Sequence, residues 1–388
     1  MLRFVIVLIW FISLNYAQDA EYCFTPLERL GRCINIKKCD SLIAILRRGK
    51  PIPELSVDLL RKSYCGNEGK DPKVCCEQES LNTDRPTSIT TEEKNTEELS
   101  DIPEPPDVSN HPNLRLLDHE SCGPVVQSKI FGGKRTGVLD FPWMALISYK
   151  TSRSPEPEFR CGGTIINKRY ILTAAHCVTG DSVNLHGVRV GDHDTSKELD
   201  CDKDKDGNNI VCAEKYQEFG IETSIYHPQY SRQNLHDDIA LLRLDGDINL
   251  QPPSVKPICF PIGPAAILTR KKVVVTGWGR TIFQPRSAAL MMIRISPIPN
   301  EECAEVYKRS AKIGYKHMCA GGERGVDSCG GDSGGPLQST AFYKETDLRY
   351  VQYGIVSFGH ANCGEEGFPA VYTRVVYYLD WILDAIRD

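Results

Sequence analysis

The chain of 388 residues lacks the usual features of nucleic-acid-binding and membrane proteins. Its net charge is only −5, and no stripe of Lys and Arg interleaved with aromatic residues occurs, so neither nucleic acid nor an anionic membrane is expected as a partner. It has no Asn-x-Ser/Thr acceptor, so N-glycosylation is not expected. Beyond the N-terminal segment, no run of residues is apolar enough to span a membrane.

The N-terminal segment MLRFVIVLIWFISLNYAQ contains an apolar run. Arg3 precedes the run from Phe4 to Leu14, and small and polar residues follow as far as Ala17. The run is too short to cross a bilayer, and this order of charge, apolar residues and small residues predicts a secretory signal peptide over residues 1–17. We therefore expect a secreted, extracellular protein.

The sixteen cysteines, an even number, fit an oxidising compartment in which all of them pair. Buried thiols or a zinc site are the alternative, but no Cys-x-x-Cys is matched by a second one or by His-x-x-x-His at ligand spacing. Residues 23–76 form a segment too small to be stabilised by a hydrophobic core alone, so it needs disulfides. It contains Cys23, Cys33, Cys39, Cys65, Cys75 and Cys76. The neighbours Cys75 and Cys76 are expected to bond to different partners, but the residues alone leave the connectivity open.

Composition divides the rest of the chain into two parts. Residues 77–129 are rich in Glu, Asp, Thr, Ser and Pro, which predicts a flexible, partly extended acidic linker. Cys122 within it is expected to tether the linker to the domain after it. From residue 130 to 388, short β-rich runs such as WMALISY and KVVVTGWG alternate with turn residues, which predicts an all-β sandwich or barrel. The final VVYYLDWILDAIRD has the apolar spacing of a C-terminal helix.

Three motifs in the β-rich part carry candidate chemistry: TAAHC ending at Cys177, DDIALL from Asp237 and DSCGGDSGGP from Asp327. Taken singly, each has a structural interpretation, as a packed His, a turn Asp or a Gly-rich turn. In the order His, Asp, Ser they resemble the trypsin/chymotrypsin family of serine proteases, over essentially all of residues 130–388. The resemblance implies an all-β, two-barrel serine endopeptidase that requires no cofactor. Its catalytic residues are then His176 as the base, Asp238 as the orienting acid and Ser333 as the nucleophile.

The same resemblance implies how substrate is bound. Backbone N–H groups of Gly331 and Ser333 form the oxyanion hole. Asp327 lies at the base of the primary pocket and selects Arg or Lys before the scissile bond, because a buried unpaired carboxylate favours a substrate that brings a cation. The other pocket residues are Ser328, Ser357, Phe358, Gly359 and Ala370. Phe358 stands where Trp is usual and Ala370 where trypsin has Gly, so we expect the added methyl group to narrow the pocket.

The stretch SKIFGGKRTGVLDFPW resembles the start of the mature chain in this family, although it lies about a third of the way along the sequence. By that resemblance, cleavage at Lys129–Ile130 frees the Ile130 ammonium to pair with Asp332. The buried pair then organises the oxyanion hole. We therefore expect a zymogen that an upstream protease activates.

The cysteine spacing over residues 23–76, followed by a linker and a trypsin-like domain, resembles the clip-domain serine proteases of arthropods. The resemblance implies a small disulfide-rich clip domain and the pairs Cys23–Cys75, Cys33–Cys65, Cys39–Cys76, Cys122–Cys259, Cys161–Cys177, Cys303–Cys319 and Cys329–Cys363. Cys201 and Cys212 are left over and are expected to bond to each other. Clip proteases act in haemolymph cascades of innate immunity, so the expected partners are prophenoloxidase or the precursor of the Toll ligand as substrate, and a serpin as inhibitor.

The loop DCDKDKDGNN raises the question of calcium. Asp202, Asp204 and Asp206 match the first half of an EF-hand loop, but Ala213 stands at the twelfth position and no helices flank the loop, so an EF-hand is excluded. Some clip proteases bind calcium in this region through a differently built loop, for which Asp192 is a candidate ligand. A plain solvated acidic loop is the alternative interpretation.

Other functions fit parts of the sequence. A non-catalytic clip homologue that acts as a cascade adaptor is disfavoured because His176, Asp238 and Ser333 are all present. A digestive trypsin is disfavoured by the clip module and the long linker. A venom enzyme with the same domains is the remaining alternative, because the sequence does not reveal the tissue of expression.

Overall fold

The structure, a computed structural model, describes residues 22–24, 30–39, 42–43, 60–61, 63–68, 71–77, 102–125, 136–151, 154–180, 184–280, 286–323, 331–344, 347–360 and 364–388. The chain divides into two compact units, residues 1–93 and residues 94–388. Within the described ranges, no helix has the length and apolar character needed to cross a membrane.

The first unit is built on a four-stranded antiparallel sheet in the order β1-β2-β4-β3. Its strands are β1 (Tyr22–Phe24), β2 (Leu30–Asn35), β3 (Tyr64–Glu68) and β4 (Asp71–Glu77), and the short 3-10 helix η1 (Ile36–Lys38) follows β2. Among the described residues of this unit, the buried core is a small cluster around Leu42 and Val74. Disulfides Cys33–Cys65 and Cys39–Cys76 therefore supply much of the stabilisation that so small a core does not.

The pairing of Cys75 is established only in part. Cys75 is disulfide-bonded, and its backbone N–H donates to Ser63 O at 2.8 Å. The side chain of its expected partner, Cys23, lies outside the described residues. The Cys23–Cys75 pair therefore stays a prediction.

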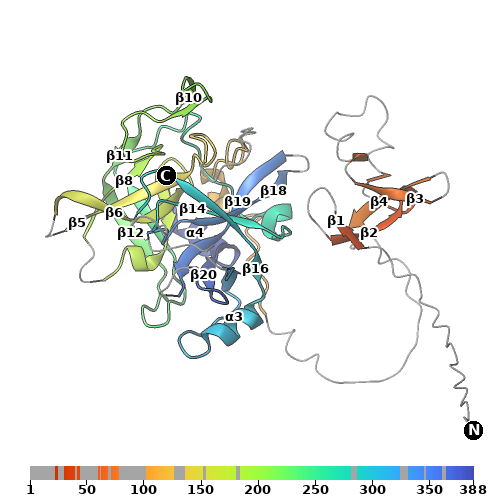
Figure 1. Cartoon of the computed structure of the whole chain (residues 1–388). Helices are drawn as coiled ribbons and strands as arrows, with labels where there is room; N and C mark the ends of the chain where they lie inside the picture. The colour runs from red at the N-terminus through yellow and green to blue at the C-terminus, as the bar shows by residue number, and fades with distance from the viewer. Residues whose placement is uncertain are drawn as a thin grey trace, which may run out of the picture. The chain divides into compact units, whose positions relative to one another are not determined.

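The second unit contains two seven-stranded antiparallel sheets, each curled into a barrel-like layer (Figure 1). The first has the order β11-β8-β5-β6-β7-β13-β12 and consists of β5 (Met144–Thr151), β6 (Ser154–Ile165), β7 (Tyr170–Thr173), β8 (Leu185–Val190), β11 (Gln217–Phe219), β12 (Ile221–Tyr226) and β13 (Ala240–Leu244). The second has the order β15-β14-β18-β19-β20-β17-β16 and consists of β14 (Val273–Gly277), β15 (Met291–Ile295), β16 (Pro297–Ile298), β17 (His317–Gly321), β18 (Pro336–Lys344), β19 (Asp347–Phe358) and β20 (Pro369–Arg374). The expected all-β, two-barrel architecture is confirmed.

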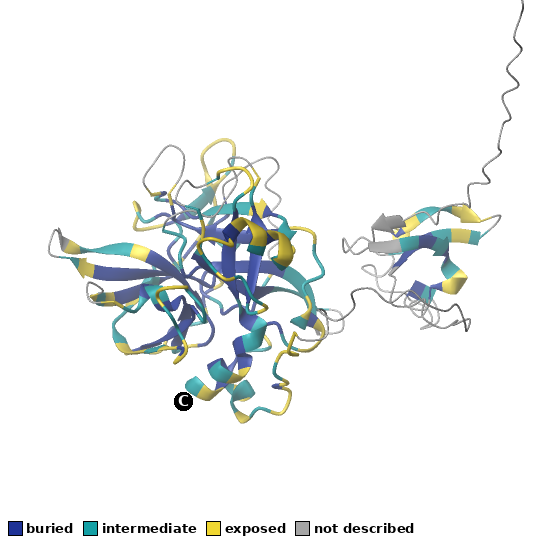
Figure 2. Cartoon of the chain, turned by 90° about the horizontal axis from the view of Figure 1, so that it is seen from below, coloured by how far each residue is buried: buried dark blue, intermediate teal, exposed yellow. Residues whose placement is uncertain are grey.

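Apolar side chains fill the inside of these sheets. Figure 2 shows long stretches of the strands in dark blue, the colour of buried residues. Strands β7, β13, β14 and β17 are buried along their whole length. The largest buried side chain, Trp143, donates its indole N–H to Gln338 Oε1 at 2.6 Å, which joins the start of the first sheet to β18 of the second. A buried hydrogen bond thus links the two sheets.

Residues 102–125 pack on the second unit, although their composition predicts an extended linker. The 3-10 helix η3 (Pro112–Leu116) lies among them, and Val108 and Leu117 are buried in the same apolar core as the first sheet. The disulfide Cys122–Cys259 holds the end of the segment. Two buried apolar residues and one disulfide thus offset an otherwise polar composition.

At Gly123 the backbone of this segment lies directly against the backbone of β19. Its N–H donates to Pro257 O at 2.8 Å, and its carbonyl accepts from Tyr350 N at 2.8 Å. The residue has φ +55°, and a Cβ atom added to it would lie 2.1 Å from Tyr350 O. Only glycine fits here, because any side chain would displace β19.

The remaining described elements of the unit connect the strands of the two sheets or follow them. They are the 3-10 helices η4 (Ala175–Cys177), η5 (Gly263–Ala266) and η6 (Val375–Tyr378), the hairpin β9 (Cys201–Lys203) and β10 (Asn209–Cys212), and the helices α3 (Asn300–Tyr307) and α4 (Leu379–Ala385). The C-terminal helix is therefore shorter than VVYYLDWILDAIRD: its first turn is 3-10 and the chain leaves the helix at Ile386. The Arg243 guanidinium binds the carbonyls of Arg387 and Asp388 there.

The second unit contains four disulfides among its described residues: Cys122–Cys259, Cys161–Cys177, Cys201–Cys212 and Cys303–Cys319. Cys122–Cys259, Cys161–Cys177 and Cys303–Cys319 are the pairs that the family resemblance implies. Cys201–Cys212 is the pair expected from the two cysteines left over. The expected Cys329–Cys363 pair lies outside the described residues.

Candidate active site

His176 and Asp238 lie side by side in the first sheet's half of the unit. His176 belongs to η4, directly after β7, and Asp238 lies two residues before β13. The Asp238 Oδ2 atom is 2.8 Å from His176 Nδ1, and Oδ1 accepts from the His176 backbone N–H at 2.8 Å. Because a carboxylate only accepts, Nδ1 carries the proton and the other ring nitrogen, Nε2, is left as the basic one.

Asp238 is fully buried and yet well supplied with hydrogen bonds. Besides the two bonds from His176, its Oδ2 accepts from Ser357 Oγ at 2.5 Å. Thr373 Oγ1 donates to the Asp238 carbonyl at 2.8 Å. Ser357 and Thr373 come from β19 and β20, so the second sheet fixes an acid that belongs to the first. These donors replace the hydrogen bonds to water that a buried carboxylate loses.

Ser333 occupies a turn between two glycines with positive φ. Gly331 has φ +103° and Gly334 has φ +78°. A Cβ atom at Gly334 would lie 2.1 Å from Thr173 Oγ1 and 2.6 Å from Gly162 O, so no larger residue fits. The glycines thus permit a tight turn that presses the serine against the first sheet.

One residue links this turn to the strand next to His176. Gly162 N–H donates to Ser333 O at 2.8 Å, and Gly162 O accepts from Thr173 Oγ1 at 2.8 Å. The neighbouring Cys161 is bonded to Cys177, which directly follows His176. The structure therefore brings His176, Asp238 and Ser333 to the junction of the two sheets.

Asp332 points away from this junction into the second sheet. Its Oδ1 accepts from the Gly279 backbone N–H at 2.8 Å. A Cβ atom at Gly277 or Gly279 would lie within 2.5 Å of the Asp332 carboxylate. The two glycines of GWG therefore make room for this acid, a role that the sequence reasoning did not assign to them. Ile130, its expected ionic partner, lies outside the described residues.

The comparisons with known proteins agree with this geometry. A family model of trypsin matches residues 130–382, and a model of the regulatory CLIP domain of proteinases matches residues 23–76. The chain belongs to the trypsin family of serine proteases. Because it carries the CLIP domain as well, it is a clip-domain protease, as the resemblance suggested.

Relatives cover nearly all of the protease. It is 36% identical to CLIP domain-containing serine protease B10 of Anopheles gambiae, with 98% of each chain covered. It is 35% identical to melanization protease 1 of Drosophila melanogaster, with 99% of each chain covered. A crystal structure of the Drosophila Grass clip serine protease of the Toll pathway matches it with a TM-score of 0.60 and 31% identity, covering 94% of this chain and 97% of that one.

The residues expected to form the primary pocket of the protease are only partly described. Asp327 and Ser328 lie outside the described residues. Ala370 is buried in β20, and a Cβ atom on Gly359 would lie 3.8 Å from the Ala370 methyl group, so the two residues face each other. Phe358 packs edge-on against Tyr307 of α3, with ring centroids 5.7 Å apart.

A cluster that sequence reasoning missed lies directly behind Asp238 in the protease. Its neighbour Asp237 has φ +53°, and its Oδ1 accepts from Lys316 Nζ at 2.7 Å and from the Tyr378 hydroxyl at 3.1 Å. Burial, followed by the charge of Asp237, raises the pKa of the Tyr378 hydroxyl, so it remains a proton donor. Lys316 precedes β17 and Tyr378 ends η6. They therefore clamp Asp237 from the second sheet's side.

Asp192, the candidate calcium ligand, lies beside an arginine. Its Oδ2 is 2.9 Å from Arg189 Nη1, but the same guanidinium also pairs with Glu218, and burial raises the pKa of the Asp192 carboxyl. Asp200 and Asp202 turn their carboxylates to backbone N–H groups. Among the described residues, the second Asp192 oxygen, Oδ1, is buried without a hydrogen-bond partner. The calcium interpretation therefore stays a prediction. One group of the described residues has the spacing of metal ligands: Cys161, His176 and Cys177. The two cysteines form a disulfide, so their sulfurs are not free thiolates.

Proposed function

We propose that this protease is a secreted zymogen that, once activated, hydrolyses one peptide bond after Arg or Lys in a protein substrate. The observation that carries the proposal is the buried Asp238, which binds both the ring and the backbone of His176. That arrangement fixes the ring in one tautomer and orientation, which a general base for a serine nucleophile requires.

The hydrogen bonds support one role for each residue. His176 Nε2 accepts the Ser333 hydroxyl proton while the serine oxygen attacks the scissile carbonyl carbon. The imidazolium that forms is stabilised by Asp238, whose Oδ2 accepts from His176 Nδ1. The Ser357 hydroxyl donates to the same oxygen and so holds the carboxylate in position. His176 then gives the proton to the leaving amine, and the acyl-enzyme is hydrolysed by water activated in the same way.

The oxyanion hole is proposed from the backbone of the same turn. The N–H groups of Gly331 and Ser333 would donate to the oxygen of the tetrahedral intermediate. The φ of +103° at Gly331 supports this role, because it is the unusual conformation that lets nearby N–H groups converge. Removing one such donor typically costs about 3 kcal/mol of transition-state stabilisation.

Activation is proposed to depend on Asp332. Cleavage at Lys129–Ile130 would release an ammonium group to pair with it and to complete the turn that carries Ser333. The Gly279 N–H bond to Asp332 supports this view, because it holds the carboxylate inside the second sheet. The disulfide Cys122–Cys259 would keep the two resulting chains together.

Specificity is proposed to come from Asp327 at the base of the primary pocket, with Ser328 beside it. A carboxylate shielded from water would bind the guanidinium of Arg or the ammonium of Lys. The Ala370 methyl group, which would lie 3.8 Å from a Cβ atom added to Gly359, supports a narrow pocket wall, because it occupies space that glycine would leave free. Efficiency towards Arg substrates should therefore be below that of a Gly-lined pocket.

We also propose a place in an arthropod haemolymph cascade. The names of two relatives, a melanization protease and a protease of the Toll pathway, support this proposal. The substrate would be prophenoloxidase or the Toll-ligand precursor, the activator an upstream protease and the regulator a serpin with a basic reactive-site residue.

The experiment is to produce the zymogen, cleave it at Lys129–Ile130 and offer the two protein substrates side by side with a short Arg peptide. Hydrolysis of the peptide and single-site cleavage of one protein would support the proposal. A cleaved protein that binds these partners but hydrolyses nothing would instead indicate the adaptor function.

A further inference from the structure

A pocket of about 360 Å³ lies on the second sheet of the protease, where β16, the end of β20 and the turns η5 and η6 meet. Leu268, Met318 and Tyr353 line it and pack in one apolar cluster. Pro105, from the segment that packs on this unit, lines it as well. The volume falls in the range of small-molecule sites, which begins near about 300 Å³.

The strand register places one cationic side chain against this apolar wall. Met318 of β17 pairs with Tyr372 of β20, so the two side chains lie on the same face of the sheet. Arg374 follows Tyr372 by two positions in the same strand and therefore stands on that face too. Arg374 is also one of the residues that line the pocket.

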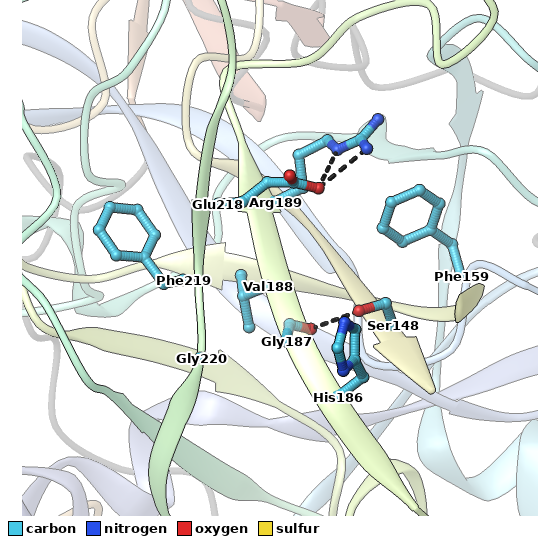
Figure 3. A pocket seen from close by; sticks show the side chains of 9 residues that line it. All are labelled: Ser148, Phe159, His186, Gly187, Val188, Arg189, Glu218, Phe219 and Gly220. Atoms are coloured by element: carbon cyan, nitrogen blue, oxygen red, sulfur yellow. Dashed lines mark hydrogen bonds and ion pairs between the residues drawn. The ribbon is translucent and has the colours of Figure 1, made fainter. Parts of the chain in front are cut away.

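The guanidinium of Arg374 is only partly used. Its Nε donates to His317 O at 3.0 Å, but among the described residues neither Nη atom has a hydrogen-bond or ion-pair partner. Burial lowers its pKa, and Glu301, whose charge acts on it, is exposed and forms no ion pair with it in the described part of the chain. By contrast, Arg189 Nε and Nη2 both donate to Glu218 Oε1, at 3.0 and 2.9 Å (Figure 3). A partly buried cation without a bound anion is costly, so the pocket favours an anion.

The two Nη groups also limit the kind of anion. A pair of parallel N–H groups binds a carboxylate in a bidentate fashion, whereas one cation cannot neutralise a phosphate group with about two charges. Leu268, Met318 and Val376 offer hydrocarbon surface to the rest of the ligand. The Tyr353 hydroxyl donates to Ala265 O at 2.9 Å and therefore leaves this surface apolar.

We propose that the pocket bounded by Leu268, Met318, Tyr353 and Arg374 binds a monocarboxylic acid with an unbranched apolar tail, such as a medium-chain fatty acid. The carboxylate binds the Nη groups of Arg374, and the tail lies against the apolar wall. This site is separate from the proposed peptide hydrolysis, because none of the described residues of the candidate active site lines the pocket.

The pocket is joined to the clamp on Asp237. The Arg374 backbone N–H donates to Lys316 O at 2.8 Å, and η6, which begins directly after Arg374, ends at Tyr378. Lys316 and Tyr378 both donate to Asp237. A ligand held by Arg374 therefore binds to the strand end and the helix that form the clamp, and it should stabilise the folded second unit.

The test measures binding to the full-length, uncut protein, so that it does not depend on catalysis. Octanoate, neutral octanol and butyrate are titrated separately by calorimetry, and Tm is measured with each of them. We expect octanoate to bind one-to-one and to raise Tm by about 5–10 °C at about a hundredfold excess over Kd. Octanol lacks the carboxylate and butyrate lacks most of the tail, so each should bind about tenfold more weakly, or weaker still.

Three variants sharpen the test. Arg374→Met removes the charge and should reduce the affinity for octanoate to that for octanol; His317 O keeps its bond from Asn300 Nδ2 at 3.0 Å, so the fold should be retained. Ile267→Glu places a negative charge on a pocket residue that is 69% exposed and should weaken octanoate binding about tenfold. Ile210→Glu, at a residue of β10 that is 68% exposed, is the matched control and should leave Kd unchanged.

Each outcome decides for or against the site. Absence of octanoate binding, equal affinities for octanoate and octanol, or a Kd that stays unchanged in both Arg374→Met and Ile267→Glu overturns the proposal. If Arg374→Met does not fold, the comparison of Ile267→Glu with Ile210→Glu decides. Inactivity of the cleaved protease would contradict the proposed function without affecting this result.

Discussion

Replacement of Lys316 by Met should weaken the support behind Asp238. The Lys316 ammonium is 2.7 Å from Asp237 Oδ1, and the two side chains are 29% and 11% exposed, so the pair is largely shielded from water. Met keeps the length of the side chain but removes the charge. Among the hydrogen bonds of the described residues, Asp237 Oδ1 would then keep only the Tyr378 hydroxyl as donor.

The magnitude follows from this geometry. A hydrogen bond to a charged group contributes about 1.5–3 kcal/mol, and the remaining exposure of Lys316 reduces that to about 1–2 kcal/mol. For a domain of this size, 1 kcal/mol corresponds to about 2–4 °C in Tm. Because Asp238 keeps its bonds from His176, Ser357 and Thr373, kcat should fall only about three- to tenfold, with KM unchanged.

The assay is a double-mutant cycle with Asp237→Asn, which tolerates the positive φ at this position. Tm, kcat and KM are measured for both single variants and the double variant, with the exposed Lys312→Met as control. A coupling free energy of about 1–2 kcal/mol is expected. Additive effects, or a loss no larger than that of the control, would refute the clamp.

Three further predictions test separate parts of the structure. Burial lowers the pKa of His317 from its ordinary 6.5 to about 4, so the unfolded chain takes up the proton first as the pH falls. The free energy of unfolding should therefore drop by about 3 kcal/mol between pH 6.5 and 4. Urea denaturation should show this drop, and a smaller one in His317→Gln. Ala370→Gly should raise kcat/KM and alter the Arg/Lys ratio on paired peptides; no change in either quantity would mean that the methyl group does not shape the pocket. Cleavage after Lys129 should yield two chains that separate only on a reducing gel, whereas uncut Lys129→Gln should be inactive; separate bands without reductant would contradict the Cys122 tether.

Short motifs predicted the candidate catalytic residues because the chemistry requires particular side chains next to particular glycines. The sequence did not predict what supports them. Ser357 was expected in the substrate pocket, yet its hydroxyl donates to Asp238 from 119 positions away. Lys316 and Tyr378 reach Asp237 across 79 and 141 positions. Such contacts arise only when two sheets pack, and no local pattern encodes them.

The linker illustrates a different limit. Its acidic, proline-rich composition predicted an extended chain. Residues 102–125 instead pack on the second unit through the buried Val108 and Leu117, a disulfide, and hydrogen bonds such as those of Gly123. Apolar residues so widely spaced have no helical or strand period. The residues alone also left the disulfide connectivity open, because pairing depends on tertiary distance. The roles of Asp327 and Ile130 stay predictions, since both lie outside the described residues.

The most direct test of the proposed mechanism is active-site titration of the protease cleaved at Lys129–Ile130, compared with Ser333→Ala treated in the same way. We predict that a serine-directed acylating reagent labels one residue, Ser333, and stops hydrolysis of an Arg peptide. Ser333→Ala should fold normally, take up no label and retain only the slow turnover that the oxyanion hole and binding provide. Near-normal turnover by Ser333→Ala would contradict the assignment of the nucleophile and, with it, the proposed mechanism.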